Sequence, residues 1–162
     1  MIRWAFDFSE THRTVVIIRI TRSFSVSEED QPAVIPPEPA PALPPSREQM
    51  RWISSPFNTL QNHRRLHKKL DAIASELNGS PFNRLIGDGP KGILAGGFAY
   101  SKLQDALGDT VTDELTILKL SALHPLPAGL VIHLLKSCDE ILILEEVEPY
   151  LEDGIKPLGF DA

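Results

Sequence analysis

A dense run of prolines constrains this chain more than any other feature. Seven of the 14 prolines lie between Pro32 and Pro45, in the sequence PAVIPPEPAPALPP. Each proline lacks a backbone N–H and fixes its own φ angle, so this stretch cannot form a helix or a central strand. We expect a stiff, extended linker over residues 32–46. The linker divides the chain into a short piece, residues 1–31, and a single domain, residues 47–162.

Composition excludes several classes of protein. The net charge of −6 and the pI near 5.3 offer no basic surface for nucleic acid or for an anionic membrane. No apolar run approaches the roughly 18 residues of a membrane helix, and the N-terminus lacks the layout of a signal peptide. The one cysteine, Cys138, excludes an internal disulfide and any cysteine-based metal site formed by this chain alone. We therefore expect a cytoplasmic protein with no nucleic-acid or membrane partner.

A β-branched segment precedes the linker. Residues Thr14–Ile20, TVVIIRI, are nearly all apolar, as is typical of a strand buried on both faces of a parallel sheet. Residues 1–13 offer at most one short helix or turn, so they cannot supply the rest of such a sheet. We expect Thr14–Ile20 to be the last strand of a sheet whose other strands lie outside this chain, which would then begin inside a larger domain.

The remainder of the chain alternates between helical and strand patterns. A stripe of apolar residues predicts a helix over Asn58–Leu77. Beyond it, strands are predicted at 82–86, 92–95, 115–120 and 140–144, and helices at 98–107 and 127–137. Strands and helices that alternate at this spacing indicate βαβ units with right-handed crossovers. The predicted fold class is α/β. We expect a Rossmann-like fold of three layers, α/β/α, with a mainly parallel sheet as the middle layer.

Two glycine motifs are candidates for phosphate binding. The segment Gly87–Gly92, GDGPKG, fits the dinucleotide pattern G-x-G-x-x-G, but its last glycine opens a strand rather than a helix. It is interpreted as a plain turn between two extended segments. Gly96 and Gly97 stand where a strand turns into a helix, and helix amides there could meet an anion. The competing and favoured interpretation is that small residues allow the helix and strand to cross closely.

Histidines and acidic residues supply the other candidates. His124 follows the end of a strand, where α/β proteins collect ligands, although the prolines beside it also suit a turn into the next helix. Glu145 and Glu146 lie beyond the last strand and are interpreted as an interface or exposed charge rather than as an acid/base pair. His63 and His67 have metal-ligand spacing on one helix but are interpreted as packed at the edge of the core. No catalytic or metal-binding set is recognised.

Several segments, taken in order, resemble one family. They are Arg19, Thr21 and Arg22 in RITR, SPFN at 80–83, GILAGGFAY at 92–100, LKL and HPLP at 118–127, and EEVEP at 145–149. Together they resemble the alpha subunit of indolepyruvate ferredoxin oxidoreductase, a thiamine-dependent 2-oxoacid:ferredoxin oxidoreductase. The matching part is the middle one, which is similar to the transketolase C-terminal domain. Residues 1–31 then resemble the terminal strand and flank of that family's pyrimidine-type domain.

The resemblance implies a parent reaction that this chain does not perform alone. The family oxidatively decarboxylates aryl 2-oxoacids to acyl-CoA, with coenzyme A as acceptor of the acyl group and ferredoxin as acceptor of the electrons. Its thiamine diphosphate, magnesium and iron–sulfur clusters would lie outside residues 1–162, so no catalytic or cofactor-binding residue is carried over. We expect an inactive structural domain whose partners are other domains or subunits of the enzyme, with a homodimer as a further arrangement. Arg19, Arg22, Glu145 and Glu146 are the interface candidates.

Two alternatives stay open at this stage. A free-standing Rossmann-like module would bind an anion, such as the phosphate of coenzyme A, near Gly96, Gly97 and His124. A regulatory partner subunit would instead dock its acidic C-terminal end on a basic surface. That end, residues 139–162, holds eight acidic residues against Lys156.

Overall fold

The chain divides into two units. The computed structural model describes residues 1–26, 28, 53–108 and 113–159. One unit combines Met1–Val16 with His67–Ala162, and the other is Ile17–Leu66. The predicted linker, residues 32–46, lies outside the described residues, so the predicted domain boundaries beside it stay predictions.

A four-stranded sheet forms the centre of the larger unit. Its strands are β1 (Arg84–Ile86), β2 (Lys91–Gly96), β3 (Leu115–Leu120) and β4 (Glu140–Leu144), in the order β1-β3-β2-β4. Strand β2 runs parallel to both β3 and β4, whereas β1 is antiparallel to β3. The prediction of a mainly parallel sheet is confirmed.

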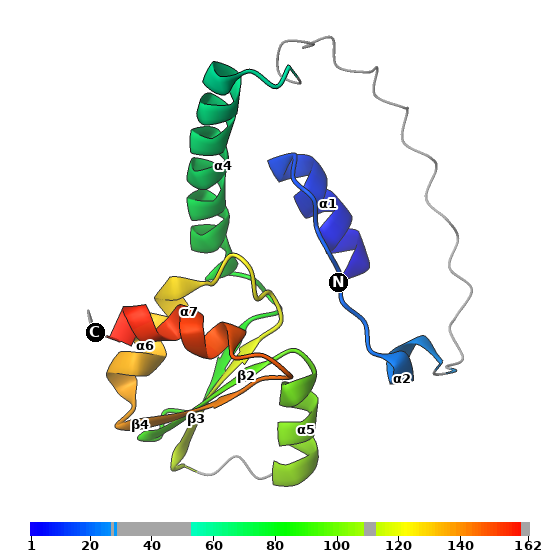
Figure 1. Ribbon diagram of the computed structural model, residues 1–162. Helices are drawn as coiled ribbons and strands as arrows, with labels where there is room; N and C mark the ends of the chain where they lie inside the picture. Colours follow the sequence, from blue (N-terminus) through cyan, green and yellow to red (C-terminus); the bar gives the residue numbers. More distant parts are fainter. Residues whose placement is uncertain (27, 29–52, 109–112, 160–162) are drawn as a thin grey trace. The chain divides into compact units, whose positions relative to one another are not determined.

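Helices cover both faces of this sheet (Figure 1). On one face, α6 (Ala128–Ser137) and α7 (Tyr150–Gly159) bury a cluster with β2 and β3. On the other face, α5 (Phe98–Leu107) buries a second, smaller cluster. The first cluster contains Leu94, Leu118, Leu120, Val131, Leu134, Leu151 and Ile155, and the second contains Ile93, Ala95, Leu103 and Ile117. The alternation of side chains along β2 and β3 supplies both clusters, and the predicted three-layer α/β/α class is confirmed.

Most of the predicted helices and strands are present. Helix α5 and strands β3 and β4 have the predicted bounds, and α4 (Pro56–Leu77) begins two residues before the predicted start. Helix α6 begins at Ala128, because Pro127 is its N-cap rather than its first residue. The sequence pattern missed α7, which contains both Gly154 and Pro157. Among the described residues, no helix combines the length and apolar character needed to cross a membrane.

Helix α1 (Ile2–His12) packs on the last turns of α4 and adds a third cluster to the larger unit. Phe8 of α1 buries against Ile73 and Leu77 of α4. Polar contacts flank this cluster: His12 Nε2 lies 2.9 Å from Glu76 Oε2, and Lys69 Nζ donates to the Arg13 carbonyl at 2.9 Å. Residues 1–13 thus contain the one short helix that the sequence allowed, and this helix is docked on α4.

Thr14–Ile20 forms no strand within the described residues, and its role as the last strand of a sheet outside this chain stays a prediction. It lies outside regular secondary structure, and its β-branched side chains are largely exposed: Val15 is 83% exposed and Ile17 is 87% exposed. A strand is defined by hydrogen bonds to a neighbour, and the sheet of the described residues contains only β1 to β4. Thr14–Ile20 therefore has the composition of a buried strand, but most of its side chains are not buried in this chain. The short helix α2 (Arg22–Ser25), capped by Thr21 Oγ1, follows in the smaller unit.

Two asparagines join the end of α4 to the sheet. Asn83 is buried; its Nδ2 donates to the Leu77 carbonyl at 3.0 Å, and its Oδ1 accepts from the N–H groups of Ser121 and Ala122 at 3.0 and 3.1 Å. Asn78 Oδ1 accepts from the Leu130 N–H of α6 at 2.9 Å. These contacts fix the loop after β3, which carries His124.

Candidate functional site

The carboxyl ends of three parallel strands gather most of the candidate residues. Strands β2, β3 and β4 run in one direction, so the segments that follow them emerge at the same edge of the sheet. Gly97 follows β2, His124 lies in the loop after β3, and Glu145 follows β4. Ligands of open α/β sheets bind at this edge. It is therefore the natural place to look for a site.

Two glycines, Gly96 at the end of β2 and Gly97 directly after it, are each required by the local structure. A Cβ atom on Gly96 would lie 2.7 Å from Leu151 Cδ1, so this glycine allows α7 to approach the strand end. Gly97 has a φ of 54°, which favours glycine, and its N–H already donates to the Leu120 carbonyl at 3.0 Å. The close approach of α7 to the end of β2 explains Gly96, in agreement with the favoured interpretation. An anion at Gly96 and Gly97 remains a prediction without further support, because the Gly97 amide is occupied.

His124 pairs with a residue that the sequence did not single out. Its Nδ1 lies 2.7 Å from the hydroxyl of Tyr150, the first residue of α7, and the two rings are tilted with centroids 6.4 Å apart. Partial burial raises the pKa of the Tyr150 phenol, so the hydroxyl stays protonated at neutral pH. The contact ties the loop after β3 to the start of α7. His124 is exposed and connects two loops at this edge.

Glu145 has a defined role as the cap of α7. Its two carboxylate oxygens accept from the N–H groups of Leu151 at 2.7 Å and Glu152 at 3.1 Å. These amides belong to the first turn of the helix, which has no intrahelical acceptors for them, and the helix dipole adds to the attraction. The acidic pattern that suggested an interface thus contains a capping residue. Whether Glu145 and Glu146 also meet a partner stays a prediction.

Replacing Glu145 with alanine should loosen α7. We expect a loss of about 1–2 kcal/mol in the free energy of unfolding, because two first-turn amides lose a charged acceptor. Amide hydrogen exchange should accelerate at Leu151 and Glu152 before it changes in the sheet. The matched control is Glu148→Ala, at an exposed neighbour, which should change stability by less than about 0.5 kcal/mol. Equal losses in the two variants would contradict the capping role.

A small cavity opens beside the His124–Tyr150 contact. Its volume is about 340 Å³, and it is lined by Leu126, Tyr150, Asp153 and Gly154. Three of these residues belong to α7, so the sequence analysis, which did not predict this helix, could not place them together. The spacing Y-x-x-D-G does put all three on one side of a helix. That signal is visible in the sequence only once α7 is assumed.

The G-x-G-x-x-G glycines lie at the opposite edge of the sheet. Gly87 to Pro90 connect β1 to the beginning of β2, where no helix starts. The turn is fastened to β3 and β4: Thr116 Oγ1 donates to the Gly89 carbonyl at 2.7 Å, and the Asp139 N–H donates to the Pro90 carbonyl at 2.8 Å. Interpretation as a plain turn is confirmed.

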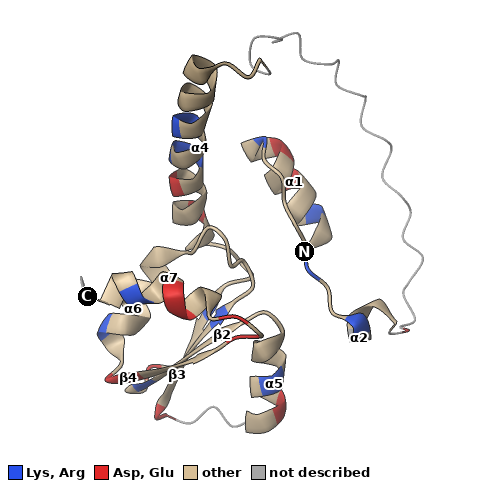
Figure 2. Cartoon of the chain, in the orientation of Figure 1, with Lys and Arg blue, Asp and Glu red and all other residues tan. Residues whose placement is uncertain are grey.

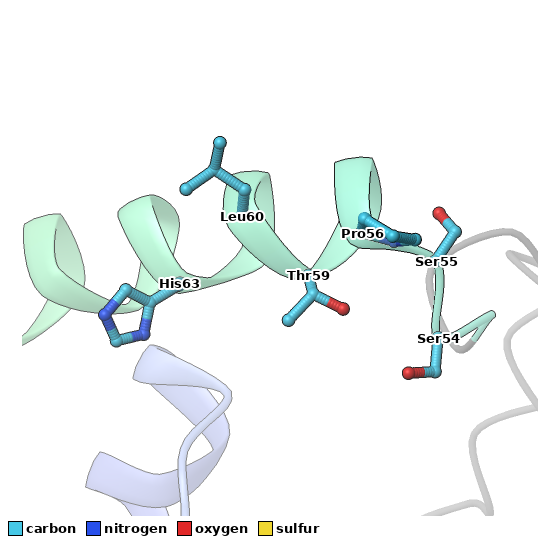
Figure 3. Close-up of a pocket in the computed structure, with 6 residues that line it drawn as sticks. All are labelled: Ser54, Ser55, Pro56, Thr59, Leu60 and His63. Atoms are coloured by element: carbon cyan, nitrogen blue, oxygen red, sulfur yellow. The ribbon is translucent and has the colours of Figure 1, made fainter.

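A second depression lies at the start of α4. About 470 Å³ in volume, it is lined by Ser54, Ser55, Pro56, Thr59, Leu60 and His63. The side chains diverge rather than converge: Leu60 points to the other side of the helix from Thr59 and His63 (Figure 3). Ser55 Oγ accepts from the Asn58 N–H at 3.3 Å and so caps the helix. His63 and His67 are both exposed, so the interpretation that they pack at the edge of the core is wrong.

The residues present do not fit the cofactors that the resemblance implies. Cys138 is the one cysteine of the sequence, so this chain cannot supply the several thiolates of an iron–sulfur cluster. Within the described ranges, no three His, Cys, Asp or Glu side chains come together as a metal site. Arg19 and Arg22 are exposed in the smaller unit, Arg22 as the first residue of α2. They remain interface candidates.

Comparison with known proteins shows which proteins this sequence is similar to. It is 30% identical over 170 aligned positions to indolepyruvate oxidoreductase subunit IorA of Thermococcus kodakarensis, covering 99% of this chain and 26% of that protein. It is 29% identical, with the same coverage, to IorA of Pyrococcus abyssi. The chain is a homologue of one segment of IorA. It spans about a quarter of the length of these relatives.

A further relative matches a shorter part of the chain. IorA of Archaeoglobus fulgidus is 35% identical over 95 residues, covering 58% of this chain and 15% of that subunit. No family model matches the chain. A solved 2-oxoglutarate:ferredoxin oxidoreductase from Magnetococcus marinus aligns with a TM-score of 0.47 and 16% identity, over 64% of this chain and 18% of that one. The resemblance to the indolepyruvate oxidoreductase family, drawn from short sequence blocks, is thus confirmed by IorA.

Proposed function

We propose that this chain is a non-catalytic interface domain of an indolepyruvate:ferredoxin oxidoreductase. The observation that carries the proposal is the match to IorA, which takes in 99% of this chain but only 26% of the relative. The parent enzyme oxidatively decarboxylates aryl 2-oxoacids to acyl-CoA and passes the electrons to ferredoxin. Thiamine diphosphate, magnesium and iron–sulfur clusters belong to other parts of that enzyme.

Exposed apolar residues before the linker support an interface role. Val15 and Ile17 are 83% and 87% exposed, and Ile20 and Phe24 are 56% and 67% exposed. Exposed apolar residues grouped within one short segment of sequence mark a candidate contact site. Since β-branched residues suit a pleated, half-buried surface, Thr14–Ile20 joins a sheet of the neighbouring domain as its last strand. Residues 1–31 then form the terminal flank of that domain and 47–162 the interface domain.

An association experiment tests this proposal. The full chain is mixed with a separately produced IorA subunit that lacks the matching segment, and complex formation is followed by analytical ultracentrifugation. Val15→Asp should weaken association by at least about ten-fold, because it places an unpaired carboxylate in an apolar contact. The control is Leu142→Asp: Leu142 is 57% exposed on β4 and lies outside both proposed contact segments. This variant should associate normally.

Two results would overturn the proposal. The first is an unchanged association constant for Val15→Asp, which would remove Thr14–Ile20 from the interface. The second is activity without partners: the chain alone, supplied with thiamine diphosphate, Mg²⁺, coenzyme A and ferredoxin, is expected not to oxidise indolepyruvate. Calorimetry with thiamine diphosphate and Mg²⁺ provides an independent measurement, and tight binding to the chain alone would count equally against it.

A further inference from the structure

The cavity beside α7 is formed by a missing side chain. Tyr150, Asp153 and Gly154 line it from one side of the helix, and Leu126 faces them from the loop after β3. A Cβ atom on Gly154 would lie 3.6 Å from Leu126 Cδ2, which is an ordinary van der Waals contact. An alanine would therefore fill part of the cavity without straining the helix. Glycine is less favourable than alanine inside a helix, so helix propensity does not explain the glycine at this position.

The cavity walls combine apolar surface with hydrogen-bond acceptors. Leu126 and the half-exposed ring of Tyr150 supply the apolar part. Asp153 supplies the only charged side chain in the lining. Its Oδ1 lies 3.5 Å from Lys156 Nζ, whereas Glu152 Oε1 lies closer to that nitrogen, at 2.9 Å. Lys156 is held mainly by Glu152, whose hydrogen bond and charge raise the pKa of the lysine, so the Asp153 carboxylate is only partly compensated.

A proline also lies in this part of α7. Pro157 has no N–H to donate to the carbonyl of Asp153, four residues earlier. The charged acceptor in the cavity lining is the Asp153 carboxylate. A ligand that donates N–H groups to this carboxylate suits the lining.

The acidic residues around the cavity favour a positively charged ligand. Between residues 145 and 156 the chain has five acidic residues, Glu145, Glu146, Glu148, Glu152 and Asp153, against Lys156. In Figure 2, acidic positions are red on α7 and on the segment that leads into it. The opposite charge, placed over the Tyr150 ring, would gain a cation–π contact as well as a hydrogen bond to Asp153. An anionic ligand would be repelled.

We propose that this cavity receives an arginine side chain of a partner protein in the assembly. The guanidinium group lies between the Tyr150 ring and the Asp153 carboxylate, and the methylene stem packs on Leu126. Arginine fits better than lysine, since its planar group stacks on aromatic rings and donates several hydrogen bonds at once. The inference rests on the proposed interface function and adds the chemistry of one contact to it.

A small probe tests the cavity without requiring the assembly. N-propylguanidinium is titrated into the full chain, and amide and aromatic chemical shifts are followed by NMR. We expect shifts confined to Tyr150, Asp153 and Gly154, with a dissociation constant in the millimolar range. N-propylurea, which has the same shape and no charge, should bind at least about ten-fold more weakly, because it forms no charge-assisted hydrogen bond.

Matched variants separate the cavity from general surface charge. Asp153→Asn and Glu152→Gln each remove one carboxylate from α7 and one partner of Lys156, but only Asp153 lines the cavity. Asp153→Asn should weaken probe binding about ten-fold, and Glu152→Gln by no more than about two-fold. Gly154→Ala should weaken probe binding about ten-fold while it stabilises the fold. Equal weakening by Asp153→Asn and Glu152→Gln, or unchanged binding in Gly154→Ala, overturns the proposal.

The association experiment keeps the two proposals distinct. If Val15→Asp disrupts the complex but Asp153→Asn and Gly154→Ala do not, the interface function stands and the arginine contact is wrong. Probe binding combined with an intact complex in Val15→Asp would retain the cavity and reject the proposed route of association. The expected result is that Asp153→Asn and Gly154→Ala each weaken the complex by about ten-fold, as loss of a buried charged contact does.

Discussion

Replacing Asn83 with alanine is expected to lower the free energy of unfolding by about 3 kcal/mol. The buried side chain satisfies three backbone groups: the carbonyl of Leu77 and the N–H groups of Ser121 and Ala122. Each buried group left without a partner costs about 1–3 kcal/mol, and partial access of water to the loop reduces the sum. The contact joins the end of α4 to the loop after β3, so its loss weakens both elements.

Urea unfolding followed by circular dichroism measures this loss. For a chain of this size, 3 kcal/mol corresponds to a fall in Tm of about 6–12 °C. Asn78→Ala is the matched control, since Asn78 is partly exposed and accepts one hydrogen bond from another element, the Leu130 N–H. It should cost about 1 kcal/mol. The prediction fails if Asn83→Ala is no more destabilising than Asn78→Ala, or if the Ser121 and Ala122 amides exchange no faster.

Local sequence pattern predicts the elements whose periodicity and burial agree. Strands β3 and β4 and helix α5 have the predicted bounds, because the strands pair within the sheet and α5 packs against one of its faces. Helix α7 was missed because glycine and proline in its interior are unfavourable for a helix. Its stability comes instead from tertiary contacts: Leu151 and Ile155 are buried in the main cluster.

Thr14–Ile20 shows what local pattern cannot decide. The β-branched pattern is strong, but a strand needs a neighbour with which to form hydrogen bonds, and pattern alone cannot say whether that neighbour is present. In this chain the segment has no regular secondary structure, and Val15 and Ile17 are exposed. The predicted sheet lies outside this chain, and the exposed residues suited to a sheet support the interface proposal.

The candidate site was only partly visible in the sequence. Strand ends and their direction correctly place His124 and Glu145 at one edge of the sheet. Their partners come from α7: His124 contacts Tyr150, 26 residues away, and Glu145 caps the helix from outside it. Cap motifs are recognised in sequence by a residue directly before a helix. A cap five residues before the helix start carries no local signal, so the role of Glu145 required the structure.

Replacing Gly89 with alanine should have a comparably large effect. A Cβ atom there would fall on the backbone of Glu114 and Leu115, far closer than atoms approach in folded proteins. This backbone cannot move aside easily, because the Lys91 N–H donates to the Glu114 carbonyl at 3.1 Å and Thr116 fastens the Gly89 carbonyl. The turn or the edge of the sheet must shift, and we expect a loss of about 3 kcal/mol or more.

The G-x-G-x-x-G pattern gives this variant a second use. If the glycines serve close packing, Gly89→Ala lowers Tm, and added NAD or NADP stabilises neither the wild-type chain nor the variant. Asp88→Ala, at an exposed position of the same turn, is the control and should change stability by less than about 0.5 kcal/mol. A dinucleotide site predicts the reverse: glycine would be needed for approach of the pyrophosphate, so the variant would keep its Tm and lose nucleotide binding. The position of the turn at the amino edge of the parallel strands, away from helix N-termini, favours the first outcome.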